Sequence, residues 1–327
     1  MLPFFLHVFK SRLRPPSFFF NFGVLVISLV AKIRSLELEI DFNRFKSSQW
    51  ILPRHDIRRK VQAKSQNLVI DLVFVVAKKD FEVLKFSLPN AFRSIPTNMR
   101  GNINLIVPRQ DLSSCTILFK DEKLPIRIID EEIMIQESDR QALKNKFGSR
   151  YTWVLQQLLK VAAVLHSESG ATLIVDADTI PLRRRNWFNK YGQQILMPSD
   201  EYNSDYYLFL SQFGICKNPP EYTFVSHHML IQRQYLVEAL ASLKISTTGE
   251  LINLICNRIQ INSQSPVCVD YELYAQFMLN RHPEEIALCR WSNISIPVKR
   301  LNHICKSSLR LRVLSLFYNS VSFHSWS

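Results

Sequence analysis

Glycine is scarce in this chain of 327 residues, and the positions of its 7 glycines exclude two phosphate-binding motifs. The glycines stand at 23, 101, 148, 170, 192, 214 and 249, so neither GxGxxG nor GxxxxGKS/T occurs. A dinucleotide-type Rossmann fingerprint and a P-loop are therefore both absent. If the protein binds phosphate groups, it does so without a glycine-rich loop.

Closely spaced cysteines and long apolar runs are lacking as well. The 6 cysteines form no CxxC motif, which argues against zinc-ribbon and thioredoxin-like proteins. We expect free, mostly buried thiols in a reducing compartment. Residues 18–31 form an apolar run of 14 residues, which is short of the ~20 residues that a membrane-spanning helix needs.

Positive charge is in excess, and most of the excess lies near the N-terminus. Of the formal net charge of +13, residues 1–64 contribute +8, from 12 Lys/Arg against 4 Asp/Glu. Three interpretations of this basic and apolar segment stay open: packing onto the main domain, peripheral contact of residues 1–34 with an anionic membrane surface, and a true anchor. The basic residues of the remainder do not cluster with aromatic residues, so we expect no nucleic-acid partner.

Residues 65–327 read as one α/β domain. Residues 68–77 (LVIDLVFVVA) form a β-branched run typical of a strand covered on both faces. Further strands are expected at 102–107, 126–130 and 195–197, with a strand running into a loop at 171–182. Helices are expected at 80–92, 151–166, 233–243, 249–259 and 271–279, and the end of the chain (313–326) reads as strand or extended chain. Strands that alternate with helices predict an open, mixed and mostly parallel sheet flanked by helices.

The motif LIVDADT (173–179) is the clearest candidate site. Residues i and i+2 of a strand share a face, so we expect Asp176 and Asp178 to point the same way while Ala177 packs behind them. Ligand sites of open α/β sheets lie beyond the carboxyl ends of strands. Two adjacent carboxylates repel each other unless a cation lies between them, which favours a divalent metal. The alternative is a capped turn in which Asp178 binds a backbone amide.

This motif and four others resemble a known family. An apolar strand that ends in DxD is the hallmark of GT-A glycosyltransferases. WVLQQLLK (153–160), LIVDADT, FVSHHM (224–229), DYELY (270–274) and SFHSW (322–326) follow one another in the order seen in a bacterial family of glycosyltransferases of the polysaccharide-synthesis type, whose specificity is unassigned. The resemblance covers roughly residues 68–327 and implies a single GT-A-like (Rossmann-like) catalytic domain, hexosyltransferase-like in its activity.

The resemblance implies a nucleotide-sugar donor whose two phosphates are bridged by a metal on Asp176 and Asp178. It also implies that His324 completes the metal shell, as a histidine near the C-terminus does in many GT-A enzymes. Oxygen ligands with one imidazole suit Mn²⁺ or Mg²⁺ better than zinc. Such a cation would stabilise the charge that develops on the departing diphosphate.

Other polar residues are candidates for donor binding. Gln157 and Lys160 lie three apart on one helix and could recognise a nucleobase or a phosphate, although a solvated polar stripe is the alternative. Lys78 and Asp80 end the first strand, where GT-A folds usually hold the nucleoside. Asp80 could equally cap the helix that follows it.

The remaining candidates concern the acceptor. Asp270 or Glu272 could act as the base that deprotonates an acceptor hydroxyl, and pairing with the helix dipole is the alternative. His227 and His228 could line the acceptor pocket or be structural.

The sequence thus predicts a metal-dependent glycosyltransferase that moves a sugar from a nucleotide-diphosphate-sugar to a glycan or glycolipid acceptor. It would act in the cytoplasm or at the inner face of the cytoplasmic membrane. One alternative is a nucleotidyltransferase, which also uses paired carboxylates and metal but typically wants a glycine-rich loop and a third carboxylate, and the glycine positions argue against it. The other is an inactive GT-A scaffold that serves as a binding module, against which the intact DAD argues.

Overall fold

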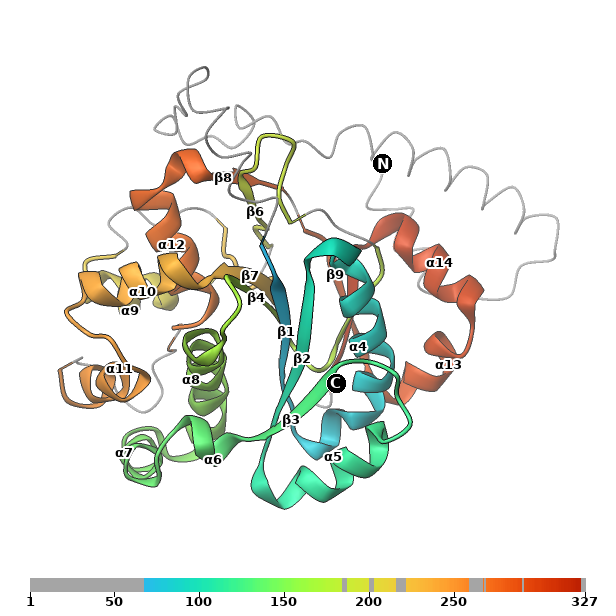
Figure 1. Ribbon diagram of the computed structural model, residues 1–327, viewed down its shortest axis with the longest axis horizontal. Coiled ribbons are helices and arrows are strands. Elements are labelled where there is room, and N and C mark those ends of the chain that lie inside the picture. Colours follow the sequence, from blue (N-terminus) through green and yellow to red (C-terminus); the bar gives the residue numbers. More distant parts are fainter. Residues whose placement is uncertain are drawn as a thin grey trace.

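The computed structural model describes residues 68–183, 187–199, 203–215, 222–258, 267, 269–289 and 291–324. A five-stranded sheet of order β3-β2-β1-β4-β7 forms its centre (Figure 1). Four strands are parallel and β7 is antiparallel to β4. The strands are β1 (Ile70–Val75), β2 (Arg100–Val107), β3 (Ile126–Asp130), β4 (Ala171–Val175) and β7 (His228–Gln232). This open, mixed and mostly parallel sheet confirms the fold class expected from the sequence.

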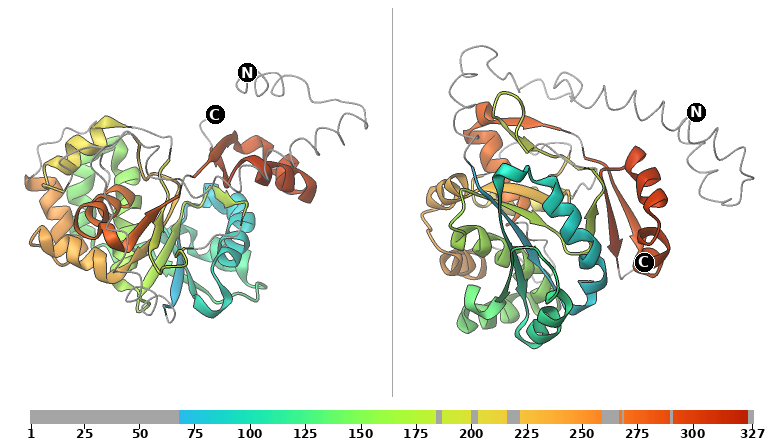
Figure 2. Two further views of the ribbon diagram at one scale, coloured as in Figure 1. Left: turned by 90° about the horizontal axis from the view of Figure 1, so that it is seen from above. Right: turned by 45° about the vertical axis from the view of Figure 1, so that its right-hand side comes forward.

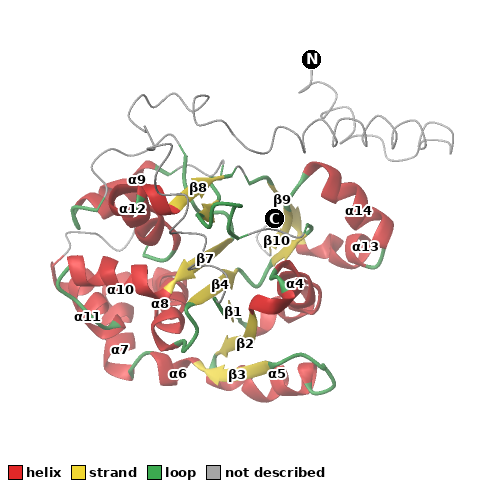
Figure 3. Ribbon diagram, turned by 45° about the horizontal axis from the view of Figure 1, so that its top comes forward, coloured by secondary structure: helices red, strands yellow, loops and turns green. Residues whose placement is uncertain are grey.

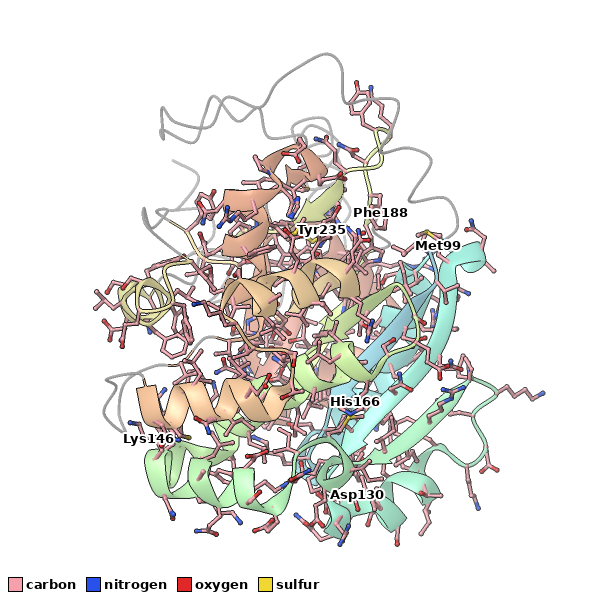
Figure 4. All side chains as sticks on the ribbon, turned by 60° about the vertical axis from the view of Figure 1, so that its left-hand side comes forward. Met99, Asp130, Lys146, His166, Phe188 and Tyr235 are labelled. Atoms are coloured by element: carbon pink, nitrogen blue, oxygen red, sulfur yellow. The ribbon has the colours of Figure 1, made fainter. Side chains whose placement is uncertain are left out.

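Helices cover both faces of the sheet. Because successive side chains of a strand point to opposite faces, alternate apolar residues pack against the two layers of helices. In β1, Ile70, Leu72 and Phe74 pack against α4 (Phe81–Ser94) and α5 (Leu112–Phe119). Val73 and Val75 point to the other face. That face is covered by α7 (Glu137–Phe147), α8 (Tyr151–His166), α10 (Arg233–Ser242), α11 (Thr248–Asn253) and α12 (Tyr271–Arg281). Figure 4 shows this packed layer, with Tyr235 of α10 in it.

A smaller unit lies beside α4. Its sheet has the order β5-β10-β9, with β5 (Thr179–Pro181), β9 (Asn293–Pro297) and β10 (Ser320–His324). The helices α13 (Leu301–Cys305) and α14 (Ser308–Phe317) accompany this sheet at the edge of the molecule (Figure 2). Val83 of α4 joins its apolar core. The remaining short elements are α6 (Glu131–Met134), β6 (Gln194–Leu196), α9 (Ser204–Ser211) and β8 (Ile286–Leu288).

The end of the chain corrects one expectation. Residues 313–326 were expected to be strand or extended chain, but α14 runs to Phe317 before β10 begins at Ser320. Leu311 and Leu314, three residues apart, pack into the core of the smaller unit, which is the spacing of a helix face. The helix expected at 249–259 also changes form, because α11 gives way to a π-helix over Leu254–Arg258.

Several expectations fall on residues that the structure does not describe. The N-terminal segment 1–64, with the three interpretations left open for it, lies outside the described residues, as do Cys216 and Cys268. The four described cysteines are free, and Cys115 and Cys305 are buried. Among the described helices, none has the length and apolar character that crossing a membrane requires.

Candidate metal and donor site

The DAD motif forms a turn directly after β4, at the carboxyl end of the central sheet. The strand ends at Val175, and the amide of Thr179 closes the turn by donating to the carbonyl of Asp176 at 3.0 Å. Ala177 is buried beneath it. The expectation that strand alternation aligns the two aspartates was therefore wrong in its reason, because both residues lie beyond the strand.

The turn nevertheless brings the two carboxylates together, and it adds a histidine to them. One ligand atom each from Asp176, Asp178 and His227 lies within 4.8 Å of the others, a cluster that could hold a metal ion. His227 precedes β7, the neighbour of β4, and its carbonyl accepts from the amide of Asp176 at 2.9 Å. Its φ of 62° is in the left-handed region, which non-glycine residues seldom adopt and which often marks a functional position.

His324 approaches the cluster from the smaller unit. Its Nδ1 lies 3.1 Å from Oδ2 of Asp178, and its Nε2 lies 3.2 Å from Oγ of Ser295. The rings of His324 and His227 are 5.9 Å apart. The strand β10 pairs with β5, which follows the DAD turn, and His324 at the end of β10 lies opposite Pro297 of β9. Figure 3 shows β10 next to β9. Its role as a metal ligand stays a prediction, and the structure adds His227 as a second candidate.

Beneath the turn, a buried lysine links two helices to Asp176. Nζ of Lys160, on α8, lies 2.7 Å from Oδ1 of Asp176 and 2.9 Å from Oδ2 of Asp270, which precedes α12. The hydroxyl of Tyr271 donates to the same Oδ1 at 2.8 Å. Burial opposes ionisation of Asp176, but Lys160 and His227 outweigh it and hold its pKa well below the usual range. Asp176 is therefore a carboxylate.

Asp80 adds a further carboxylate near the turn. It follows the carboxyl end of β1, and its side chain makes no capping hydrogen bond to the helix α4. Burial raises its pKa to about 6, and the nearby charges of Asp178 and Asp176 act in the same direction, against Lys79. Lys78 is exposed, and its backbone amide donates to Asp111 at 3.1 Å. Their roles in donor binding stay predictions.

The side-chain amide of Gln157 forms hydrogen bonds with the backbone. Its Nε2 donates to the carbonyl of Val267 at 2.8 Å, and its Oε1 accepts from the amide of Val269 at 3.0 Å. The side chain is buried, so the solvated polar stripe considered as an alternative is absent at this residue and at the buried Lys160. Gln157 fixes the segment that leads into Asp270.

The two expected acceptor-side pairs separate in the structure. Glu272 is fully buried, accepts from the amide of Phe224 and accepts from Nε2 of Gln276 at 3.1 Å. Burial raises the pKa of Glu272 to about 7, partly offset by these two donors. His228 is buried against Trp291, with ring centroids 3.9 Å apart, and its Nδ1 lies 2.8 Å from the carbonyl of Ser226. Asp270 and His227, in contrast, belong to the cluster around Asp176.

The ligand atoms that this site offers suit a hard divalent cation. The carboxylates of Asp176 and Asp178 converge with the imidazole of His227, and the carboxyl group of Asp80 lies close by. Among the described residues, the cationic Lys160 contacts Asp176. Oxygen ligands with one or two imidazoles suit Mn²⁺ or Mg²⁺. Sequence reasoning missed Tyr271 and the place of His227 in the candidate metal cluster, because neither follows from a strand-end motif.

Comparisons with known proteins give distant structural matches. No protein-family model matches the chain, and no curated protein sequence matches it at a significant level. Mouse xyloside xylosyltransferase 1, in its apo form, is similar with a TM-score of 0.42 and 11% identity, over 78% of this chain and 98% of that one. The galactosyltransferase LgtC, in complex with donor and acceptor sugar analogs, gives a TM-score of 0.40 at 11% identity, over 77% of this chain and 86% of LgtC. Scores below 0.5 carry no argument about activity, so the site is interpreted from its own residues.

Proposed function

We propose that the protein is a metal-dependent glycosyltransferase that uses a nucleotide-diphosphate-sugar donor. The observation that carries the proposal is the convergence of Asp176, Asp178 and His227 at the carboxyl end of β4. Ligand sites of open α/β sheets lie at this edge. A divalent cation held there, Mn²⁺ or Mg²⁺, would act as a Lewis acid for the departing diphosphate.

Different residues of the protein would bind that cation, orient its ligands and contact the donor. Asp178, whose side chain is the more exposed of the two, offers the oxygens that face the donor, while Lys160 and Tyr271 fix Asp176 from below. His227 lies 3.3 Å from Asp176 and His324 lies 3.1 Å from Asp178, so both can supply nitrogen ligands. Asp80 does not end β1 as expected, because that strand stops at Val75; it lies in the 3-10 helix Lys78–Asp80 between β1 and α4, where it can contact the nucleoside.

For the base that accepts the proton of an acceptor hydroxyl, we propose Asp270 rather than Glu272. Asp270 shares Lys160 with Asp176 and therefore lies beside the cluster. Glu272 is enclosed by Phe224 and Gln276, which supports a structural role. His228 is proposed to shape the acceptor side through its contact with Trp291.

The acceptor is proposed to be a glycan or glycolipid of polysaccharide synthesis, modified at the inner face of the cytoplasmic membrane. The test is a screen of nucleotide-sugars for donor turnover with Mn²⁺, Mg²⁺ or a chelator. We expect turnover that the chelator abolishes and that Asp178→Asn lowers about a hundredfold or more, since lost stabilisation of a developing charge has this size. Turnover that is unchanged in Asp178→Asn would remove the assignment.

A nucleotidyltransferase is the second candidate, because Asp80 supplies the third carboxylate that such an enzyme wants. The same screen separates the two activities. Release of pyrophosphate from a nucleoside triphosphate, without turnover of any nucleotide-sugar, would favour the second candidate.

A further inference from the structure

The Lys and Arg residues in the C-terminal part of the chain have no Asp or Glu among them, and the proposed reaction does not use their positive charge. Residues 286–327 contain six Lys/Arg and no Asp or Glu. Within them, the 3-10 helix η8 (Val298–Arg300), α13 and α14 follow one another and form the outer layer of the smaller unit (Figure 2). We call the exposed side of these three helices the basic face.

The basic face keeps its charges in solvent. Its exposed basic side chains are Lys299, Arg300, Lys306, Arg310 and Arg312. None of them forms an ion pair with another described residue, whereas the exposed Lys85 of α4 pairs with Glu82 at 2.7 Å. Arg310 donates a hydrogen bond to the carbonyl of His303 and so links α14 to α13.

The same helices bury their other side. Leu301, Ile304 and Cys305 of α13 enter the core shared with Val83 of α4, and Leu311 and Leu314 of α14 pack against it. The basic residues are therefore held on a folded scaffold rather than on a loose tail. Positive charges held close together on one side attract an anionic surface more strongly than the same charges spread around the molecule.

Two large apolar side chains stand among the charges. Leu309 is 53% exposed and Val298 is 36% exposed. Neither of these two exposed apolar residues is aromatic, so neither offers the stacking surface that single-stranded nucleic acids use. A lipid headgroup layer, in contrast, binds basic side chains at its surface and accepts aliphatic side chains below it.

We propose that the basic face binds the headgroup surface of an anionic lipid bilayer. The strand β5, which directly follows the DAD turn, pairs with β10 of the same unit, and Arg183 donates to the carbonyl of Ser315 in α14. Docking through α13 and α14 would therefore hold the metal cluster close to the bilayer. The docking itself does not depend on the proposed glycosyl transfer.

The test is sedimentation of the full chain with vesicles of phosphatidylcholine and phosphatidylglycerol in equal parts, and with vesicles of phosphatidylcholine alone. The variant combines Lys299→Gln, Lys306→Gln and Arg312→Gln, whose side chains make no ion pair or hydrogen bond with the residues that the structure describes. The matched control combines Lys120→Gln, Lys123→Gln and Arg127→Gln, which are exposed near α5 and β3 and remove the same charge. Each basic residue near a lipid surface contributes about fivefold, so we expect about a hundredfold weaker binding for the variant.

The control should retain wild-type binding to the anionic vesicles, and Leu309→Ser alone should weaken it. Equal losses in variant and control would mean that net charge alone acts, and would overturn the proposal. Wild-type binding by the variant would also overturn it, and would leave vesicle binding to residues 1–34. Binding to duplex DNA is measured alongside. If the variant loses DNA binding and keeps its vesicle binding, the face is assigned to nucleic acid instead.

Discussion

Lys160 holds Asp176 in place from beneath the DAD turn. Its Nζ lies 2.7 Å from Oδ1 of Asp176, and the same ammonium reaches Asp270 at 2.9 Å. One oxygen of Asp176 is thereby taken by the protein, while Oδ2 lies 3.3 Å from Nδ1 of His227 on the side of the cluster. The first carboxylate of the motif is thus oriented by a buried cation before any metal binds.

Replacement of this lysine should therefore destabilise the protein strongly. In Lys160→Met, the buried Asp270 and the half-buried Asp176 lose their shared partner, and breaking a buried ion pair costs about 3–5 kcal/mol. Urea unfolding measures the change. The control is Lys85→Met, an exposed residue paired with Glu82, for which we expect a loss of at most about 1 kcal/mol. Equal effects at both positions would contradict the bridging role.

The two histidines can be separated by metal affinity. A true ligand, when removed, should weaken Mn²⁺ binding by more than the ten- to hundredfold that is typical of residues supporting a ligand. We expect His227→Gln to exceed this range, because its nitrogen converges with both carboxylates. Calorimetric titration of Mn²⁺ into His227→Gln and His324→Gln gives the order. A larger loss in His324→Gln would return the ligand role to the C-terminal histidine.

Glu272 predicts a pH dependence of stability. Its pKa is about 7 in the folded protein and 4.5 ordinarily, so the unfolded chain releases the proton first as the pH rises. Stability that depends on this group is therefore present below about pH 4.5 and is lost progressively up to about pH 7. Glu272→Gln lacks this loss. The difference in unfolding free energy between Glu272→Gln and the wild type should therefore shift by about 3 kcal/mol in favour of the variant from about pH 4 to about pH 8.

Chemical unfolding at a series of pH values tests this, with the exposed Glu122→Gln as control. A constant difference between Glu272→Gln and the wild type across the whole range would show that the fold does not raise the pKa of this carboxyl.

Gln157 should prove structural. Gln157→Leu leaves the carbonyl of Val267 and the amide of Val269 without their partner, which costs about 1–3 kcal/mol for each buried group. We expect a lower unfolding free energy with an unchanged affinity for UDP and GDP in the presence of Mn²⁺, measured by calorimetry. The opposite pattern, normal stability with weakened nucleotide binding, would restore the donor-binding interpretation.

Local patterns in the sequence predicted the central sheet well. The β-branched run at 68–77 contains β1, and the residues expected for the third strand and for the helix at 151–166 match β3 and α8. The strand β1 is buried on both faces and α8 on a wide stripe, so their apolar patterns are strong. The helix α14 was missed because its face is interrupted by Arg310 and Arg312, which leave the pattern mixed.

The candidate site depends on contacts that no single segment contains. Lys160 contacts Asp176, 16 positions away along the chain, and Asp270, 110 positions away. Lys160 and Asp176 were singled out for the donor and Asp270 as a possible base, yet only the fold shows that the lysine contacts both aspartates. His227 depends on the antiparallel pairing of β7 with β4, a strand that its short apolar run did not predict.

The most direct test of the metal-bridged donor is a calorimetric titration of UDP and GDP into the full chain, with and without Mn²⁺, in the wild type and in Asp178→Asn. The account predicts nucleoside-diphosphate binding that requires Mn²⁺ in the wild type and that is lost in the folded variant. Binding of equal strength without Mn²⁺, or unchanged Mn²⁺-dependent binding in Asp178→Asn, would contradict it.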